Sequence, residues 1–200
     1  MRASLITGLS GPHLTPDEAR FLADVRPCGL ILFARNCETP DQVRRLISEA
    51  KEAIGEHDIL VLIDQEGGRV RRLMPPTWRD LPPAAAYARL AEADFEHAEA
   101  TARLVARLIA ADLRDLGINT NCVPVLDIPA PGSHEIIGDR TYGTTPEIVA
   151  SLGRAVAEGH LAGGVLPVIK HIPGHGRAQA DSHLELPIVT ASREELSATD

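Results

Sequence analysis

Short apolar runs alternate along this chain with longer segments in which apolar residues recur at helical spacing. The runs are Leu5–Leu9, Gly29–Phe33, Ile59–Ile63, Ile118–Leu126 and Val165–Ile169. Most of them are continuous rather than alternating in polarity, which is typical of parallel strands that are buried on both faces. The pattern therefore predicts an α/β protein with a parallel sheet.

The starts of the intervening helices are marked by capping residues. Thr15-Pro16-Asp17-Glu18 and Thr39-Pro40-Asp41-Gln42 have the form of capping boxes with proline at the first helical position. Thr145-Pro146 repeats the cap, and Ser192-Arg193-Glu194-Glu195 is a further capping box. A long helix is predicted from about residue 95 to residue 116, ending at a glycine. Strand and helix thus alternate, as parallel sheets require.

The placement of charged motifs favours a (β/α)8 TIM barrel over a doubly wound sheet. Asp64, Arg140 and Lys170 each follow a different predicted strand, as when several loops converge on the mouth of one barrel. A doubly wound fold usually carries a G-x-G-x-x-G phosphate loop, and the sequence has none. Five strands fall short of eight, and the last residues lie in an apparent helix without a glycine stop. We expect residues 1–200 to form a single domain, a barrel truncated after about five or six β/α units.

Composition limits the classes of partner. The net charge of −8 argues against a nucleic-acid groove or an anionic membrane surface, and no apolar stretch approaches the length of a transmembrane helix. The cysteines Cys28, Cys37 and Cys122 are odd in number and lack the spacing of a disulfide framework or a zinc site. We expect a cytoplasmic protein with reduced thiols, no nucleic-acid or membrane partner, and no cofactor.

The densest chemistry follows the last apolar run. Lys170-His171-Ile172-Pro173-Gly174-His175-Gly176 is followed, after four residues, by Asp181-Ser182-His183. A buried strand that delivers charged residues into a loop rich in glycine and proline is typical of the active site of an α/β enzyme.

These motifs resemble the β-N-acetylglucosaminidase branch of glycoside hydrolase family 3. Two further segments share the resemblance: Ile63–Val70 with Arg72, and Ile137–Gly143. The resemblance implies an exo-acting, retaining β-N-acetylhexosaminidase. It also implies a small, soluble amino-sugar substrate: terminal N-acetylglucosamine on the anhydro-N-acetylmuramic acid of peptidoglycan fragments, as in cell-wall recycling.

The resemblance assigns roles to individual residues. His183 is the implied general acid/base, a task that suits an imidazole because its pKa lies near neutrality, and Asp181 is its orienting partner. The implied sugar-binding residues are Asp64, Arg72, Arg140, Lys170 and His171.

Structural alternatives stay open for several of these residues. Arg72 could instead be a solvated surface residue. Asp64 and Glu66 could cap the following turn. Arg140 could simply form an ion pair with Asp139. Glu66 is ambiguous between binding and bracing. Asp127 is expected to be structural although it faces the mouth.

Two residue types in the loop lead to further expectations. His175 is expected to brace the loop through hydrogen bonds to backbone. Gly174 and Gly176 are expected to let the loop that bears Asp181 and His183 swing.

The sequence lacks one part of the implied machinery. The family places an aspartate nucleophile in a Ser-Asp-Asp-like turn, and no such turn occurs in these 200 residues. We therefore expect the nucleophile beyond residue 200 and the chain alone to be inactive. A non-catalytic or fragmentary sugar-binding protein is the alternative. A metal-dependent hydrolase using His171, His175, Asp181 and His183 is disfavoured, because Pro173 and Gly174 prevent a regular helix there.

Overall fold

The computed structural model describes residues 2–130, 135–172, 174–180 and 184–199. Within these ranges a five-stranded, wholly parallel sheet has the strand order β1-β2-β3-β4-β5. The strands are β1 (Ala3–Gly8), β2 (Pro27–Leu32), β3 (Leu60–Ile63), β4 (Thr120–Asn121) and β5 (Leu166–Pro167). The sequential order of parallel neighbours is that of consecutive β/α units in a barrel wall.

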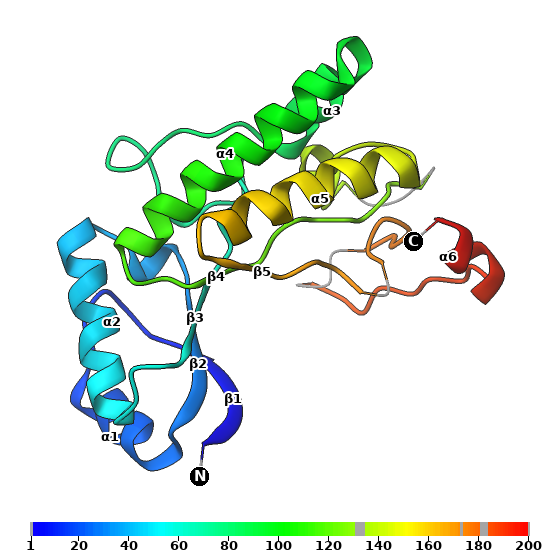
Figure 1. The fold of residues 1–200 in the computed structure, drawn as a ribbon. Helices are drawn as coiled ribbons and strands as arrows, with labels where there is room; N and C mark the ends of the chain where they lie inside the picture. Colours follow the sequence, from blue (N-terminus) through cyan, green and yellow to red (C-terminus); the bar gives the residue numbers. More distant parts are fainter. Residues whose placement is uncertain (1, 131–134, 173, 181–183, 200) are drawn as a thin grey trace.

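Helices connect the strands and cover one side of the sheet (Figure 1). They are α1 (Pro16–Val25), α2 (Pro40–Ile54), α3 (Ala84–Ala93), α4 (Phe95–Asp115), α5 (Pro146–Ala162) and α6 (Arg193–Thr199), with short 3-10 turns η1 (Ala34–Asn36) and η2 (Gly138–Arg140). Helices α4 and α5 lie side by side, and α6 lies at the end of the segment that leaves β5 (Figure 1). None of the described helices is long and apolar enough to cross a membrane.

The predicted helix caps are largely confirmed. Thr15 and Glu18 form a reciprocal capping box, and Ser192 and Glu195 form another. Thr39 accepts a hydrogen bond from the Gln42 amide, but the Gln42 side chain accepts from the Glu38 amide instead of completing the box. At Thr145 no side-chain cap bond forms, although helix α5 begins at the predicted proline.

Two predictions about the strands are wrong in detail. The run Ile118–Leu126 contributes only Thr120–Asn121 to the regular ladder, because Pro124 has no N–H to donate. Pairing resumes at an isolated parallel bridge between Val125 and Lys170. The edge strands are also less buried than expected: β2, β3 and β4 lie mostly inside, whereas Ile6 and Leu166 are exposed.

The buried core lies between the sheet and its helices. One cluster packs β2 and β3 against α1, α2 and the end of α4. A second cluster packs α3, α4 and α5 together around Tyr87 and Tyr142, whose rings stack with centroids 6.2 Å apart. Helix α3 was not predicted, although its alanine-rich start favours a helix. The rigid core leaves the ends of β3, β4 and β5 as the place where loops project polar side chains.

Candidate active site

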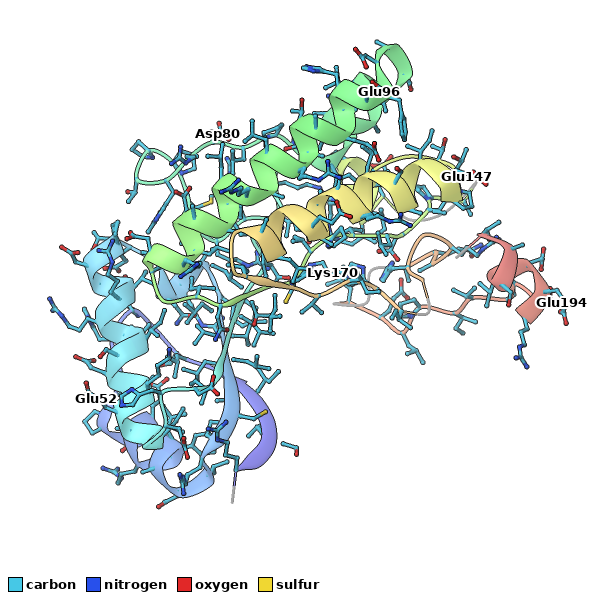
Figure 2. All side chains as sticks on the ribbon, viewed as in Figure 1. Glu52, Asp80, Glu96, Glu147, Lys170 and Glu194 are labelled. Carbon is cyan, nitrogen blue, oxygen red and sulfur yellow. The ribbon has the colours of Figure 1, made fainter. Side chains whose placement is uncertain are left out.

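Charged residues gather where β3, β4 and β5 end. Asp64 directly follows β3, Asp127 lies six residues beyond β4, and Lys170 lies three residues beyond β5. Because the strands are parallel, their carboxyl ends share one edge of the sheet, and loops of different sequence position meet there. Figure 2 shows Lys170 near the centre of the molecule, below α5 in this view.

Asp64 is held between two cations. Its carboxylate oxygens lie 2.8 Å from Lys170 Nζ and 3.1 Å from an Arg72 guanidinium nitrogen. Burial by itself would raise the pKa of Asp64, but the charge and hydrogen bond of Lys170, then those of Arg72, outweigh it and hold the pKa below its usual range. Asp64 is thus an ionised acceptor. The alternatives of a turn cap for Asp64 and a free surface position for Arg72 are not what the structure shows.

Glu66 forms a second, deeper clamp. Both of its oxygens accept from Arg140, at 2.9 Å each, and one also lies 2.6 Å from Lys170 Nζ. Its side chain is only 8% exposed. Asp139, the alternative partner considered for Arg140, pairs with Arg69 instead. The structure therefore gives Glu66 a bracing role that the sequence left ambiguous.

A cavity of about 370 Å³ lies beside these ion pairs. Its walls are formed by Asp64, Arg69, Val70, Arg72, Ile136, Arg140, Lys170, His171 and His175. All five residues predicted to bind sugar line this one cavity, whereas Glu66 does not. The cavity presents one carboxylate, several cations and two imidazoles, a set that suits a neutral ligand with many hydroxyl groups.

A buried hydrogen-bond network supports the wall that carries Asp64 and Arg72. Asn121 exchanges hydrogen bonds with the Gln65 backbone at 2.9 and 3.0 Å, and its amide nitrogen lies 3.0 Å from His160 Nε2. The Gln65 side chain in turn accepts from the amides of Arg72 and Leu73. His160 is fully buried, a placement that was not predicted from the sequence, and its other ring nitrogen lies 3.0 Å from the Val156 carbonyl oxygen. Its spacing of four from Val156 on the buried face of α5 was the available signal.

The start of the loop after β5 is pinned. Asp127 accepts from the His175 amide at 2.6 Å, and the Ala130 amide donates to the Gly176 carbonyl at 2.8 Å. His175 therefore holds the loop through its main chain. Both of its ring nitrogens are buried without a hydrogen-bond partner among the described residues, which contradicts the expected bracing by the imidazole.

Gly176 also departs from expectation. A Cβ atom at this position would lie 2.0 Å from the Ile128 carbonyl oxygen, so the glycine permits a close backbone approach. Gly174, with a φ of +144°, adopts a conformation that favours glycine. The expectation that both residues provide freedom to swing is not supported at Gly176. Asp181 and His183, the predicted acid/base pair, lie outside the described residues.

Gly176→Ala is expected to lower the free energy of unfolding by about 1–3 kcal/mol, because the methyl group overlaps backbone that must shift. Urea unfolding followed by circular dichroism measures the change. Gly11→Ala is the matched control, since a Cβ at Gly11 meets nothing within 4 Å. Equal stabilities for the two variants would show that the contact with Ile128 is not constraining.

No group of three or more potential metal ligands occurs among the residues that the structure describes. The rings of His171 and His175 lie edge to face with centroids 5.9 Å apart. Their nitrogens are not arranged with a third described ligand. The metal-dependent alternative therefore gains no support from the described part of the loop.

Relatives of known structure carry the same fold. NagZ from Neisseria gonorrhoeae in complex with N-trifluoroacetyl-D-glucosamine superposes with a TM-score of 0.91 at 34% identity, over 99% of this chain and 58% of that one. A family 3 β-N-acetylglucosaminidase from Paenibacillus gives a TM-score of 0.87 at 37% identity, over 98% of this chain and 36% of that one. The fold is therefore that of the NagZ barrel domain, as predicted.

Sequence relatives agree. A β-hexosaminidase of Methylococcus capsulatus is 43% identical over 96% of this chain and 55% of its own length, and one of Pseudomonas aeruginosa is 39% identical over all of this chain and 58% of its own. The chain thus spans a little over half the length of these curated relatives. The family model for the glycosyl hydrolase family 3 N-terminal domain matches residues 6–200. This chain belongs to glycoside hydrolase family 3.

Proposed function

We propose that residues 1–200 form one domain, the N-terminal part of an exo-acting, retaining β-N-acetylhexosaminidase. The observation that supports this most is the single cavity that Asp64, Arg72, Arg140, Lys170 and His171 line together. The named activities of the relatives give the sugar: curated relatives are β-hexosaminidases, and the NagZ neighbour holds an N-acylated glucosamine.

The cavity offers the contacts that a sugar ring requires. Each oxygen of Asp64 is paired with one cation and can accept a further hydrogen bond from a sugar hydroxyl. Lys170 and Arg72 have additional donors for the lone pairs of the same hydroxyls. Charge-assisted hydrogen bonds in a half-buried cavity orient the glycosidic bond for the reacting groups.

The proposed chemistry divides between this chain and residues beyond it. His183 protonates the departing oxygen and later activates water, with Asp181 orienting its imidazole. An aspartate outside residues 1–200 attacks the anomeric carbon. The chain by itself is expected to bind sugar without hydrolysing it, because catalytic groups that act as a unit fail together.

The proposed substrates are peptidoglycan fragments that carry N-acetylglucosamine on anhydro-N-acetylmuramic acid. We place the reaction in the cytoplasm, and the free thiols of Cys28, Cys37 and Cys122 agree with a reducing compartment. Incubating the complete enzyme with this disaccharide, with and without its peptide, should release N-acetylglucosamine detectable by mass spectrometry. Cleavage of aryl hexosaminides without cleavage of either fragment would contradict this choice of substrate.

Glu66→Gln tests the clamp beneath the cavity. The neutral amide of glutamine is a weaker hydrogen-bond acceptor for Arg140 and Lys170 than the carboxylate, so both cations should lose their positions. In the complete enzyme kcat/KM should fall roughly 10- to 150-fold, which corresponds to a loss of about 1.5–3 kcal/mol of transition-state stabilisation.

Glu158→Gln is the matched control for this change. Glu158 pairs with Arg103 on the outer surfaces of α4 and α5, where both side chains are half exposed. Such a pair contributes little, so this variant should keep the wild-type kcat/KM. If Glu66→Gln also retains full kcat/KM, Glu66 does not organise the site.

A further inference from the structure

Asp127 is a buried carboxylate whose hydrogen bonds to described residues all come from the loop after β5. Its side chain is 1% exposed. One oxygen lies 2.5 Å from His171 Nδ1, and the other accepts from the main-chain amides of His175 at 2.6 Å and His171 at 3.4 Å. Each of these three contacts joins a carboxylate oxygen of Asp127 to a nitrogen atom.

The protonation of Asp127 follows from these contacts. Burial alone would raise the pKa of Asp127, but the hydrogen bonds from the His171 side chain and the His175 amide keep the pKa below its usual value. An ionised carboxylate only accepts hydrogen bonds. The 2.5 Å contact therefore requires a proton on Nδ1 of His171.

The other ring nitrogen of His171 faces Arg140. Nε2 lies 3.5 Å from an Arg140 guanidinium nitrogen, and a guanidinium only donates. A proton on Nε2 would set two donors against each other, so the surroundings favour a bare Nε2 whose lone pair faces Arg140 across this long contact. Both His171 and Arg140 line the cavity. The ring therefore carries its acceptor edge on a wall of the cavity, where a ligand hydroxyl that approaches Nε2 closer than the 3.5 Å of Arg140 would take the lone pair.

We propose that Asp127 is a positioning residue that fixes the tautomer of His171, so that the cavity presents an unprotonated Nε2 to its ligand. The ligand must then meet His171 with a hydrogen-bond donor, that is, with a hydroxyl group and not with an ether or carbonyl oxygen. The identity of the ligand as an N-acetylhexosaminide rests on the proposed function, whereas the state of the imidazole does not.

Asp127→Asn reverses the tautomer with little change of shape. The amide oxygen still accepts from the His175 main chain, while the amide nitrogen donates to Nδ1. The proton of His171 must then move to Nε2. The cavity acquires a donor where the native protein has an acceptor.

Nitrogen NMR of the complete enzyme labelled with ¹⁵N-histidine reads the tautomer directly, because bare and protonated ring nitrogens resonate far apart. The signals of His171 are assigned by their loss in His171→Gln. We expect Nδ1–H with a bare Nε2 in the wild type, and the reverse in Asp127→Asn. A wild type with a proton on Nε2 overturns the proposal, and this outcome does not depend on the folding of Asp127→Asn. An Asp127→Asn spectrum identical to wild type overturns it equally.

Binding of deoxyfluoro sugars tests the consequence for the ligand. The 3-, 4- and 6-deoxyfluoro analogues of N-acetylglucosamine each replace one hydroxyl with fluorine, which cannot donate a hydrogen bond. The analogue that lacks the hydroxyl in contact with Nε2 should bind the wild type roughly 5- to 10-fold more weakly than the parent sugar. In Asp127→Asn that penalty should shrink or vanish. The remote Asp115→Asn should retain the full penalty, since Asp115 pairs with Arg44 far from the cavity.

The outcomes separate the two proposals. Identical fluorine penalties in wild type and Asp127→Asn at all three positions would show that His171 does not select a donor. Absence of any binding by N-acetylglucosamine would refute the proposed function instead, and the NMR result would still decide the tautomer.

Discussion

Asp64→Ala in the complete enzyme is expected to lower kcat/KM by about 2–4 kcal/mol of transition-state stabilisation, roughly 30- to 1,000-fold. The variant removes an ionised acceptor from the cavity and leaves Lys170 and Arg72 without the carboxylate between them. Initial rates with an aryl N-acetyl-β-glucosaminide measure the loss.

Two further variants separate contact from charge. Asp64→Asn keeps an acceptor oxygen but loses the charge that holds the two cations, so its rate should lie between those of wild type and Asp64→Ala. Asp115→Ala removes an exposed carboxylate paired with Arg44 and should leave the rate unchanged. An unaltered kcat/KM in Asp64→Ala would mean that Asp64 merely supports the loop.

His183→Ala is expected to slow substrates with sugar leaving groups far more than nitrophenyl glycosides. A nitrophenolate departs without a proton, whereas general acid catalysis contributes about 10²–10⁴-fold for a poor leaving group. Azide should partly rescue the rate, because it replaces the water that His183 activates. Comparing kcat/KM for the two leaving-group classes, with and without azide, measures the effect.

Asp181→Asn serves as the graded companion of this variant. It keeps the size of the side chain while weakening the support of the imidazole, so the same pattern should be seen in milder form. If His183→Ala slows both classes of substrate equally and azide has no effect, His183 binds the sugar and is not the acid/base.

Local signals were sufficient to predict most of the architecture. Continuous apolar runs indicated where the strands lie along the chain, and Thr-Pro and Ser-x-x-Glu patterns indicated the starts of α1, α2, α5 and α6. The exposure of β1 and β5 was not predictable in this way, because an apolar run does not reveal how many neighbours a strand has. An apolar residue such as Ile6 or Leu166 is equally compatible with a central strand and with an edge strand.

The site was predicted as a set of residues and not as a set of contacts. The positions of Asp64, Arg140 and Lys170 after strands indicated a common cavity, which the structure confirms. The partners of Glu66 and Asp127 depend on loops 74 and 44 residues away, and no local pattern specifies such pairings. Gly176 illustrates the same limit. The sequence shows that a glycine is present, but it does not show whether the glycine serves a close backbone approach or a flexible backbone.

The most direct test is the preference of the complete enzyme between 4-nitrophenyl N-acetyl-β-glucosaminide and 4-nitrophenyl β-glucoside. The two substrates share a leaving group and differ only at the 2-position of the sugar. A β-N-acetylhexosaminidase should show a kcat/KM for the N-acetylated substrate about 100-fold or more above that for the glucoside. Equal values, or a preference for the glucoside, would contradict the proposed activity.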